Sequence, residues 1–398
     1  MARSKTKSKT SVAIFCIIAV ILGFIGGGFG ITYATLPYNE ELIVSEEVYY
    51  SYNENEKINT VPVVIENGSM SIHFLELGNK YTGDCTYIKV GEDIDILIDC
   101  GSKSNSISTI QAYLDNYVTD NTLEYVIITH AHQDHYAGFA TTEKVSSIFD
   151  LYVCENIIDF ARTNQKETAK VYGNYLRELE DEMQAGANHF TALDCWNEEF
   201  VEQADGETVQ AQKEYLLDEV NEISFQILYQ KFYEEDASSE NDYSVCVMFS
   251  HGDRNFLFTG DLEEDGEESL VENNALSKVE LYKAGHHGSK TSSSEALLSV
   301  IQPQIVCVCC CAGSSEYTST KDNQFPTQEF INRVAKYTEA IYVTTLCVDY
   351  KNDEFTSFNG NIVVTSTAST FGVNCSNNNT ILKDSEWFKE NRTWPNEV

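Results

Sequence analysis

The sequence predicts an α/β fold that follows a single N-terminal transmembrane helix. Short apolar runs of strand-like composition alternate with segments of helical periodicity between residues 69 and 368. Four of these runs end in His or Asp, which is typical of α/β proteins that build a site at the carboxyl ends of their strands. An apolar segment without any charge, residues 11–33, precedes them and predicts the helix.

Composition supports a large folded domain and argues against a nucleic-acid-binding surface. Of the 398 residues, 42% are hydrophobic, which is enough for a sizeable buried core. The 26 basic and 62 acidic residues give a net charge of −36. Because phosphate backbones are bound through clustered Lys and Arg, we expect long nucleic acid not to be a partner.

The N-terminal region predicts attachment to the cell membrane. Residues 11–33 exceed the roughly 20 apolar residues that a helix needs to cross a bilayer. Residues 1–10 carry four basic side chains and are expected to be cytoplasmic, which places the rest of this single-pass protein outside the cytoplasm. A cleavable signal peptide, which would make the protein secreted, is the alternative. Residues 34–68 are acidic and rich in Tyr and Asn, so they predict a linker.

The main domain is expected to span residues 69–368. Its predicted strands IDILID, EYVIITH, NFLFTGD and VELYKAGHH end at Asp99, His130, Asp261 and His286–His287. The acidic segment at about 155–220 carries apolar residues three and four positions apart, which predicts a helical insertion. Residues 360–368 predict a last edge strand, and the aromatic side chains of residues 369–398 predict a tail that packs on the domain.

The sequence HAHQDH, at residues 130–135, predicts a metal site. His130 and His132, two positions apart after a strand, can hold one divalent ion, while Asp134 and His135 can hold a second. Imidazole nitrogens with carboxylate oxygens suit zinc first, with manganese or iron as alternatives. We therefore expect two divalent metal ions as cofactors.

This stretch has the form His-X-His-X-Asp-His of the metallo-β-lactamase superfamily, which the chain resembles. Further stretches occur in the order found in the hydrolase domain of the competence protein ComEC and its free-standing relatives, namely GDCTYI, LIDCG, NDYSVCVMF, FTGDLE and AGHHGSKTSSS. The resemblance implies a four-layered αββα sandwich over residues 69–368 and a hydrolase with a dinuclear metal site.

The resemblance also implies roles for individual residues. His130 and His132 would bind metal one, and Asp134 and His135 would bind metal two. Asp261 would bridge the two ions. His286 would complete metal two and His287 would face the substrate, although the sequence leaves the choice between these neighbours open because adjacent residues on an extended segment point apart.

Other positions have less certain roles. Asp99 is expected to hold a ligand His through its other ring nitrogen. Asp84 could do the same, could replace a ligand on metal one, or could be an ordinary turn residue. Many superfamily members add a third His to metal one, and only His189 and His251 are available for it, the latter expected at an exposed hairpin tip. The Gly-His-Pro stretch of the competence-like branch reads Gln-Phe-Pro at residues 324–326, so one contact to the substrate or leaving group is missing.

The expected chemistry is metal-assisted hydrolysis. Two divalent ions lower the pKa of a shared water and neutralise the charge that develops during an in-line displacement, so no Ser or Cys nucleophile is required. Asp134 or Asp261 would orient the resulting hydroxide and take its proton.

The segment after His287 predicts a phosphate site. Ser292 and Glu295 have the spacing of a capping box, so a helix is expected to begin there. Free backbone amides at a helix N-terminus favour anions. Together with Ser289 and Lys290, they would bind the phosphoryl group of a substrate.

The sequence thus predicts a membrane-anchored, extracytoplasmic hydrolase that acts on a phosphodiester or related small ester. Its negative field favours small or zwitterionic substrates. Nuclease, lactonase or β-lactamase activity on the same fold is the first alternative, and a non-catalytic surface binding module is the second. A complete set of metal ligands disfavours the binding module.

Overall fold

A computed structural model describes residues 66–140 and 145–395. The basic N-terminus, the apolar segment at 11–33 and most of the predicted linker lie outside these residues. No helix in the described ranges combines the length and the apolar character that crossing a membrane requires. Attachment to the membrane therefore stays a prediction.

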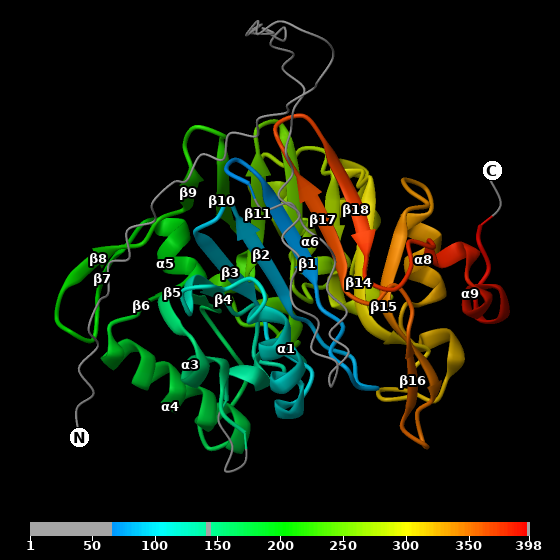
Figure 1. Cartoon of the computed structure of the whole chain (residues 1–398), viewed down its shortest axis with the longest axis horizontal. Helices are drawn as coiled ribbons and strands as arrows, with labels where there is room; N and C mark the ends of the chain where they lie inside the picture. Colours follow the sequence, from blue (N-terminus) through cyan, green and yellow to red (C-terminus); the bar gives the residue numbers. More distant parts are fainter. Residues whose placement is uncertain (1–65, 141–144, 396–398) are drawn as a thin grey trace, which may run out of the picture. The chain divides into compact units, whose positions relative to one another are not determined.

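Two eight-stranded sheets form the centre of the described domain (Figure 1). The first has the order β18-β17-β1-β2-β3-β4-β5-β6. Its strands are β1 (Met70–Phe74), β2 (Thr86–Val90), β3 (Ile94–Ile98), β4 (Thr122–Ile127), β5 (Val153–Asp159), β6 (Asn188–Thr191), β17 (Ile362–Ser366) and β18 (Phe371–Cys375). The N-terminal strand β1 thus lies beside β17, which is near the other end of the chain (Figure 1).

The second sheet has the order β16-β15-β14-β13-β12-β11-β10-β9. Its strands are β9 (Glu214–Asp218), β10 (Ile223–Leu228), β11 (Cys246–His251), β12 (Arg254–Phe258), β13 (Leu281–Lys283), β14 (Ile305–Ala312), β15 (Ile341–Asp349) and β16 (Glu354–Ser357). A separate pair is formed by β7 (Phe200–Glu202) and β8 (Thr208–Gln210).

The two sheets pack face to face, with helices on their outer sides. Phe74 of β1 stacks on Phe258 of β12 at 6.1 Å between ring centroids, and Tyr125 of β4 contacts Phe225 of β10 at 5.1 Å. The first sheet is covered by α1 (Ile107–Leu114), α3 (Ile148–Leu151) and α4 (Lys170–Ala185), and the second by α6 (Glu264–Asn273), α7 (Glu295–Ile301), α8 (Gln328–Val334) and α9 (Glu386–Asn391). Two short helices, α2 (Gln133–Tyr136) and α5 (Ala192–Asn197), complete the set. This arrangement confirms the predicted αββα sandwich.

Parallel strands bring the chemically important turns to one edge of each sheet. In the first sheet β3, β4 and β5 run parallel, with Ile98 opposite Ile127 and Ile127 opposite Ile158. In the second sheet β12, β13 and β14 are also parallel. Because parallel strands end at the same edge, the residues that follow them lie close together.

The segment at 155–220 differs from the predicted helical insertion. Only α4 and the short α5 are helical, whereas β6 extends the first sheet and β9 extends the second. The apolar spacing that predicted helix belongs to Lys170–Ala185, where Tyr172, Tyr175 and Leu179 are buried. The remaining strands have three to five residues, too few for their alternation to stand out in the sequence.

The C-terminal region also departs from one prediction. The strand expected at 360–368 is β17, which is an interior strand because β18 pairs with its outer edge. Beyond β18, Leu382 and Phe388 are buried against the outer side of the second sheet, with Trp387 and Trp394 partly buried beside them. The aromatic tail therefore contributes to the fourth layer.

Candidate metal centre

The HAHQDH stretch directly follows β4 and turns into α2. His132 has extended backbone and precedes the helix, so Asp134 and His135 lie on its first turn. The preceding residue, Thr129, is fixed by Asp99 at the end of β3, which accepts hydrogen bonds from its backbone N–H and its hydroxyl, both at 2.8 Å. Two parallel strand ends thus determine where the motif begins.

Four buried side chains from four different segments converge beside this motif. Asp84, His135, Asp261 and His287 each offer a ligand atom within 4.8 Å of the others. The Nε2 atoms of His135 and His287 are 3.3 Å apart, and Oδ2 of Asp261 lies 3.2 and 3.3 Å from them. Oδ2 of Asp134 is 3.5 Å from Nε2 of His287. Nε2 of His135, Nε2 of His287 and Oδ2 of Asp261 thus face one point, and Oδ2 of Asp134 lies at its rim.

The other ring nitrogens of both imidazoles are held from behind. Nδ1 of His135 lies 2.7 Å from Oδ2 of Asp99, and Nδ1 of His287 lies 2.9 Å from the carbonyl oxygen of Cys309. Such contacts orient a ligating imidazole and select which nitrogen faces the ion. The role expected for Asp99 is therefore compatible with its position.

His130 and His132 form a second group of nitrogen donors. Nε2 of His130 is 3.0 Å from Nδ1 of His132. The opposite nitrogen of His130 lies 3.1 Å from the Thr129 hydroxyl and 3.4 Å from that of Ser244. Ser244 in turn accepts a hydrogen bond from the backbone N–H of Asp261 at 3.0 Å. This contact links the His130 group to the carboxylate that faces His135 and His287.

Opposite charges dominate the electrostatics of the centre. Burial opposes the charged form of His135, but Asp261 and Asp99 on either side raise its pKa to about 10. Burial likewise opposes ionisation of Asp261, yet His135 and His287 hold its pKa below the usual range. The buried Lys283 ammonium forms an ion pair with Asp84 and lies 3.7 Å from Oδ1 of Asp261. The charged forms of Asp84 and Asp261 are thus favoured by the cationic groups beside them.

The donor set fits divalent metal ions. Oδ1 of Asp84 and Oδ1 of Asp261 are buried and accept no hydrogen bond from any described residue. Lys283 compensates part of this buried charge, and a divalent ion among the imidazoles would compensate more of it. Imidazole nitrogens with carboxylate oxygens are the ligands of zinc and related ions. A dinuclear site is therefore plausible on both geometry and charge, while the identity of the ions stays a prediction.

The structure places His287, and not His286, within the group of clustered donors. His287 is buried within the group, whereas His286 lies to one side, with Nδ1 3.0 Å from the Thr291 hydroxyl, 3.4 Å from Nδ2 of Asn241 and 3.6 Å from Oε1 of Glu263. Both histidines adopt left-handed backbone conformations, so the extended-chain geometry assumed from the sequence does not apply to them. His286 is therefore not among the clustered donors.

The two candidates for a third His on metal one lie elsewhere. Nε2 of His189 is 3.0 Å from Oδ1 of Asp159, at the ends of β6 and β5. His251 ends β11 opposite Arg254, so its predicted place at a hairpin tip is confirmed, but it is only 3% exposed and the expected surface position is wrong. Asp84 faces Lys283 instead of the His130 group.

The predicted phosphate site does not form as expected. Helix α7 begins after Ser294, whose hydroxyl accepts a hydrogen bond from the N–H of Leu297, so the cap lies two residues beyond Ser292. The Ser292 hydroxyl donates to the carbonyl of Leu262 at 2.6 Å. The amides of Ser293 and Ser294 donate to the Glu267 carboxylate, both at 2.6 Å. An internal carboxylate thus occupies the amides that were predicted to bind substrate.

Ser289 and Lys290, the other two predicted substrate-binding residues of that segment, differ in exposure. The Ser289 hydroxyl is buried and lies 3.1 Å from that of Thr291. The exposed Lys290 donates to Oδ1 of Asn323 at 3.1 Å. Of these two, Lys290 alone presents its polar group at the surface.

Two residues near the centre were not selected from the sequence. Lys283 ends β13, and a charged residue inside an apolar run was the available signal for it. Tyr317, in the loop after β14, donates its hydroxyl to Oδ2 of Asp134 at 2.6 Å. The sequence contains no signal for Tyr317, because 183 residues separate it from Asp134.

Comparison with known proteins shows which family part of this chain resembles. Residues 78–204 match the metallo-beta-lactamase superfamily. Over 108 residues, the chain is 31% identical to Recombination protein 2 of Haemophilus influenzae, which covers 27% of the chain and 13% of that protein. Over 69 residues, it is 35% identical to ComE operon protein 3 of Bacillus subtilis, which covers 17% of the chain and 9% of that protein. These matches confirm the resemblance to the superfamily and to its competence-protein branch.

Solved structures to which the chain is similar include one from Bacillus subtilis and one from yeast. The metallo-beta-lactamase fold protein YhfI from Bacillus subtilis has a TM-score of 0.39 and 10% identity, with 75% of this chain and 100% of that chain covered. A long form RNase Z from yeast has a TM-score of 0.36 and 14% identity, with 62% and 38% covered. The matches to Recombination protein 2 and ComE operon protein 3 span only 13% and 9% of the length of those two proteins.

Proposed function

We propose that this protein is a membrane-anchored, extracytoplasmic phosphodiesterase or phosphoesterase that uses two divalent metal ions, with zinc as the ion that the donor set favours. The observation that carries this proposal is the convergence of His135, Asp261 and His287, with Asp134 at the rim, around one point. Asp134, His135, Asp261 and His287 would hold one ion. His130 and His132, with Asp261, would hold the other.

When bound, the two ions supply Lewis acidity and activate a water molecule at neutral pH. The side chains of the protein prepare the place for this chemistry. Asp99 and the carbonyl of Cys309 fix the imidazoles of His135 and His287 in orientation. Lys283 neutralises Asp84, so that the buried carboxylates do not accumulate uncompensated charge. Asp134, 15% exposed, is the carboxylate placed to accept a proton near the substrate.

The proposed substrate is a small phosphoester. The net charge of −36 repels long polyanions and favours small or zwitterionic molecules. In the cell, the protein would bind such a small molecule as its substrate. It would also contact the membrane through residues 11–33.

The experiment that tests this function compares four substrates with the full chain purified in detergent. These are a bis-aryl phosphate, an aryl phosphorylcholine, a chromogenic cephalosporin and single-stranded DNA. Metal content is measured first, and the assays are then repeated after chelation and after metal is returned. We expect turnover of a small phosphoester that is lost on chelation and restored by metal.

Other outcomes would overturn the proposal in different ways. Cleavage of the cephalosporin alone would exclude a phosphoesterase in favour of a lactamase. Absence of bound metal together with absence of turnover would favour the non-catalytic binding module. Preferential cleavage of DNA would replace the small substrate with a nucleic acid.

A further inference from the structure

A tyrosine hydroxyl lies beside the candidate metal centre, next to the residue that stands in place of the histidine in the Gly-His-Pro stretch of the competence-like branch. The sequence reads Gln-Phe-Pro at 324–326, and the Phe325 ring lies 5.6 Å from the ring of His286 and 5.9 Å from that of His287. A phenyl ring at this position offers no hydrogen bond. The Tyr317 ring lies 5.8 Å from Phe325, and its hydroxyl reaches Asp134.

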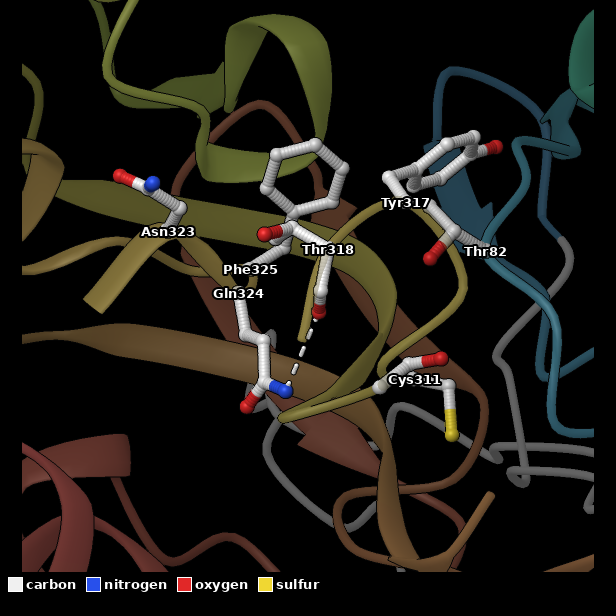
Figure 2. Close-up of a pocket in the computed structure, with 8 residues that line it drawn as sticks. Thr82, Cys311, Tyr317, Thr318, Asn323, Gln324 and Phe325 are labelled. Atoms are coloured by element: carbon white, nitrogen blue, oxygen red, sulfur yellow. Dashed lines mark hydrogen bonds between the residues drawn. The ribbon is translucent and has the colours of Figure 1, made fainter. Parts of the chain in front are cut away.

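Figure 2 shows the surroundings of these two rings in the pocket beside the centre. The rings of Tyr317 and Phe325 lie at one end of the view, and Cys311 and Gln324 lie at the other. Thr82, two residues before Asp84, is next to Tyr317. Aromatic walls and neutral polar groups therefore border the centre on this side.

The loop that carries Tyr317 is anchored on both sides. The carboxylate of the preceding residue, Glu316, accepts a hydrogen bond from the backbone N–H of Thr82 at 2.9 Å and lies 3.4 Å from Nζ of Lys103. The N–H of Gly313 donates to the carbonyl of Phe325 at 2.8 Å, which closes the loop. The phenol is thus held over Asp134 although the residue is 55% exposed. An accessible group in a fixed position is suited to contact a ligand.

The carboxylate that accepts the Tyr317 hydrogen bond also lies beside the clustered donors. Oδ2 of Asp134 receives the Tyr317 hydroxyl at 2.6 Å and also lies 3.5 Å from Nε2 of His287. The phenol oxygen is therefore separated from the proposed ion position by a single carboxylate oxygen. An oxygen atom of a ligand held at that ion would come within reach of the same hydroxyl.

We propose that, when the substrate binds, the Tyr317 hydroxyl turns away from Oδ2 of Asp134 and donates its hydrogen bond to a phosphoryl oxygen of the substrate. This inference rests on the phosphoesterase function proposed above. It makes Tyr317 a substrate-binding residue, and Phe325 the apolar wall against which the phosphoester lies. Hydrogen bonds to charged groups are stronger than those between neutral groups, so the contact should be measurable in binding.

The experiment measures the binding of inorganic phosphate to the metal-loaded full chain by calorimetry. Tyr317→Phe removes the hydroxyl and keeps the ring, and we expect phosphate to bind about 10- to 100-fold more weakly. Tyr337→Phe is the matched control, because the Tyr337 hydroxyl also donates to a carboxylate, Oε1 of Glu295, at 2.7 Å, but between the segment after α8 and the start of α7. This control should bind phosphate like the unaltered protein.

Metal content separates the alternatives. Tyr317→Phe should retain the full complement of metal, since the proposed contact is to the ligand. A variant that loses metal would show that Tyr317 only positions Asp134, which overturns the substrate contact. Equal phosphate binding by the variant and the unaltered protein would overturn this inference alone. If the unaltered, metal-loaded protein bound no phosphate, the proposed function would fail with it.

Discussion

His286 and His287 are neighbours in the chain, but only His287 lies within the clustered donors of the candidate metal centre. Their φ angles of 46° and 54° are both left-handed, a conformation that side chains other than glycine seldom adopt. The next residue, Gly288, also has a positive φ of 79°, and a Cβ there would approach that of Pro326 to 2.8 Å. This strained turn buries His287 in the centre and leaves His286 at its side.

Alanine substitution of each histidine tests this division. We expect His287→Ala to lose about one metal ion per chain, because the ion would keep too few protein ligands. His286→Ala should retain both ions, since its ring is not among the clustered donors and its Nδ1 contacts Thr291 and Asn241. Elemental analysis of the dialysed proteins measures the difference, and the opposite ranking would restore the assignment made from the sequence.

A second prediction at the residue scale concerns Asp99. Its Oδ2 atom lies 2.7 Å from Nδ1 of His135 and also accepts the Thr129 hydroxyl. Asp99→Asn should weaken metal binding by about 10- to 100-fold, as is usual for residues that orient a ligating imidazole. Competition with a chromophoric chelator measures the affinity. Asp93→Asn, at an exposed position of the preceding turn, is the control, and an equal loss in both variants would refute the orienting role.

At the scale of elements, α6 and α7 are joined through one buried carboxylate. Glu267 of α6 accepts the backbone N–H groups of Ser293 and Ser294, directly before α7. Because Ser294 caps α7 and the chain leading to it carries His287, this contact fixes the segment between the metal centre and the helix. Burial raises the pKa of Glu267 to about 7.

Glu267→Gln should lower the free energy of unfolding by about 1–3 kcal/mol, because an amide group would oppose one of the two N–H donors. The raised pKa adds a pH dependence. A carboxyl group whose pKa is higher in the folded state contributes stability below its ordinary value of 4.5, and this contribution is lost as the pH rises through about 7. The advantage of the unaltered protein over the variant should therefore be larger at pH 5 than at pH 8.

Chemical denaturation of both proteins at the two pH values measures this effect. Glu268→Gln is the matched control, since the neighbouring Glu268 is exposed on the same helix. It should change stability little at either pH. A pH-independent difference between the unaltered protein and Glu267→Gln would contradict the proposed titration.

At the scale of the whole molecule, the net charge and the strand topology both affect which substrates can reach the candidate metal centre. The net charge of −36 surrounds a centre whose own carboxylates are compensated by Lys283 and by imidazoles. The sandwich brings the ends of β3 and β4 together with those of β12 and β13 at this centre. A long polyanion must therefore approach through a repulsive field, whereas a small zwitterion need not.

This field predicts opposite salt responses for two kinds of substrate. The rate of any cleavage of single-stranded DNA should rise several-fold when the ionic strength increases from about 0.01 to 0.15 M, because the screening length falls from about 30 to 8 Å. Cleavage of an aryl phosphorylcholine should change little over the same range. Initial rates at low substrate concentration measure both. A DNA rate that falls steeply with salt would instead reveal a basic contact surface.

Much of the centre could be predicted because its first part is local. His130, His132, Asp134 and His135 lie within six consecutive residues after a strand, so their proximity follows from the sequence alone. The α/β class could also be predicted, since several strand-like runs of the sequence end in His or Asp. The strands between 188 and 218 were missed because short segments leave no periodic pattern.

The sequence by itself determined the types of donor, the resemblance to the superfamily and the charge of this protein, because these depend on residue identity and local spacing. Only the tertiary structure decided that His287 rather than His286 faces His135, across 152 residues of chain, and that Glu267 occupies the amides before α7. It also placed Tyr317 on Asp134. Such choices depend on backbone conformation and on contacts between distant segments, which packing fixes and which no local pattern encodes.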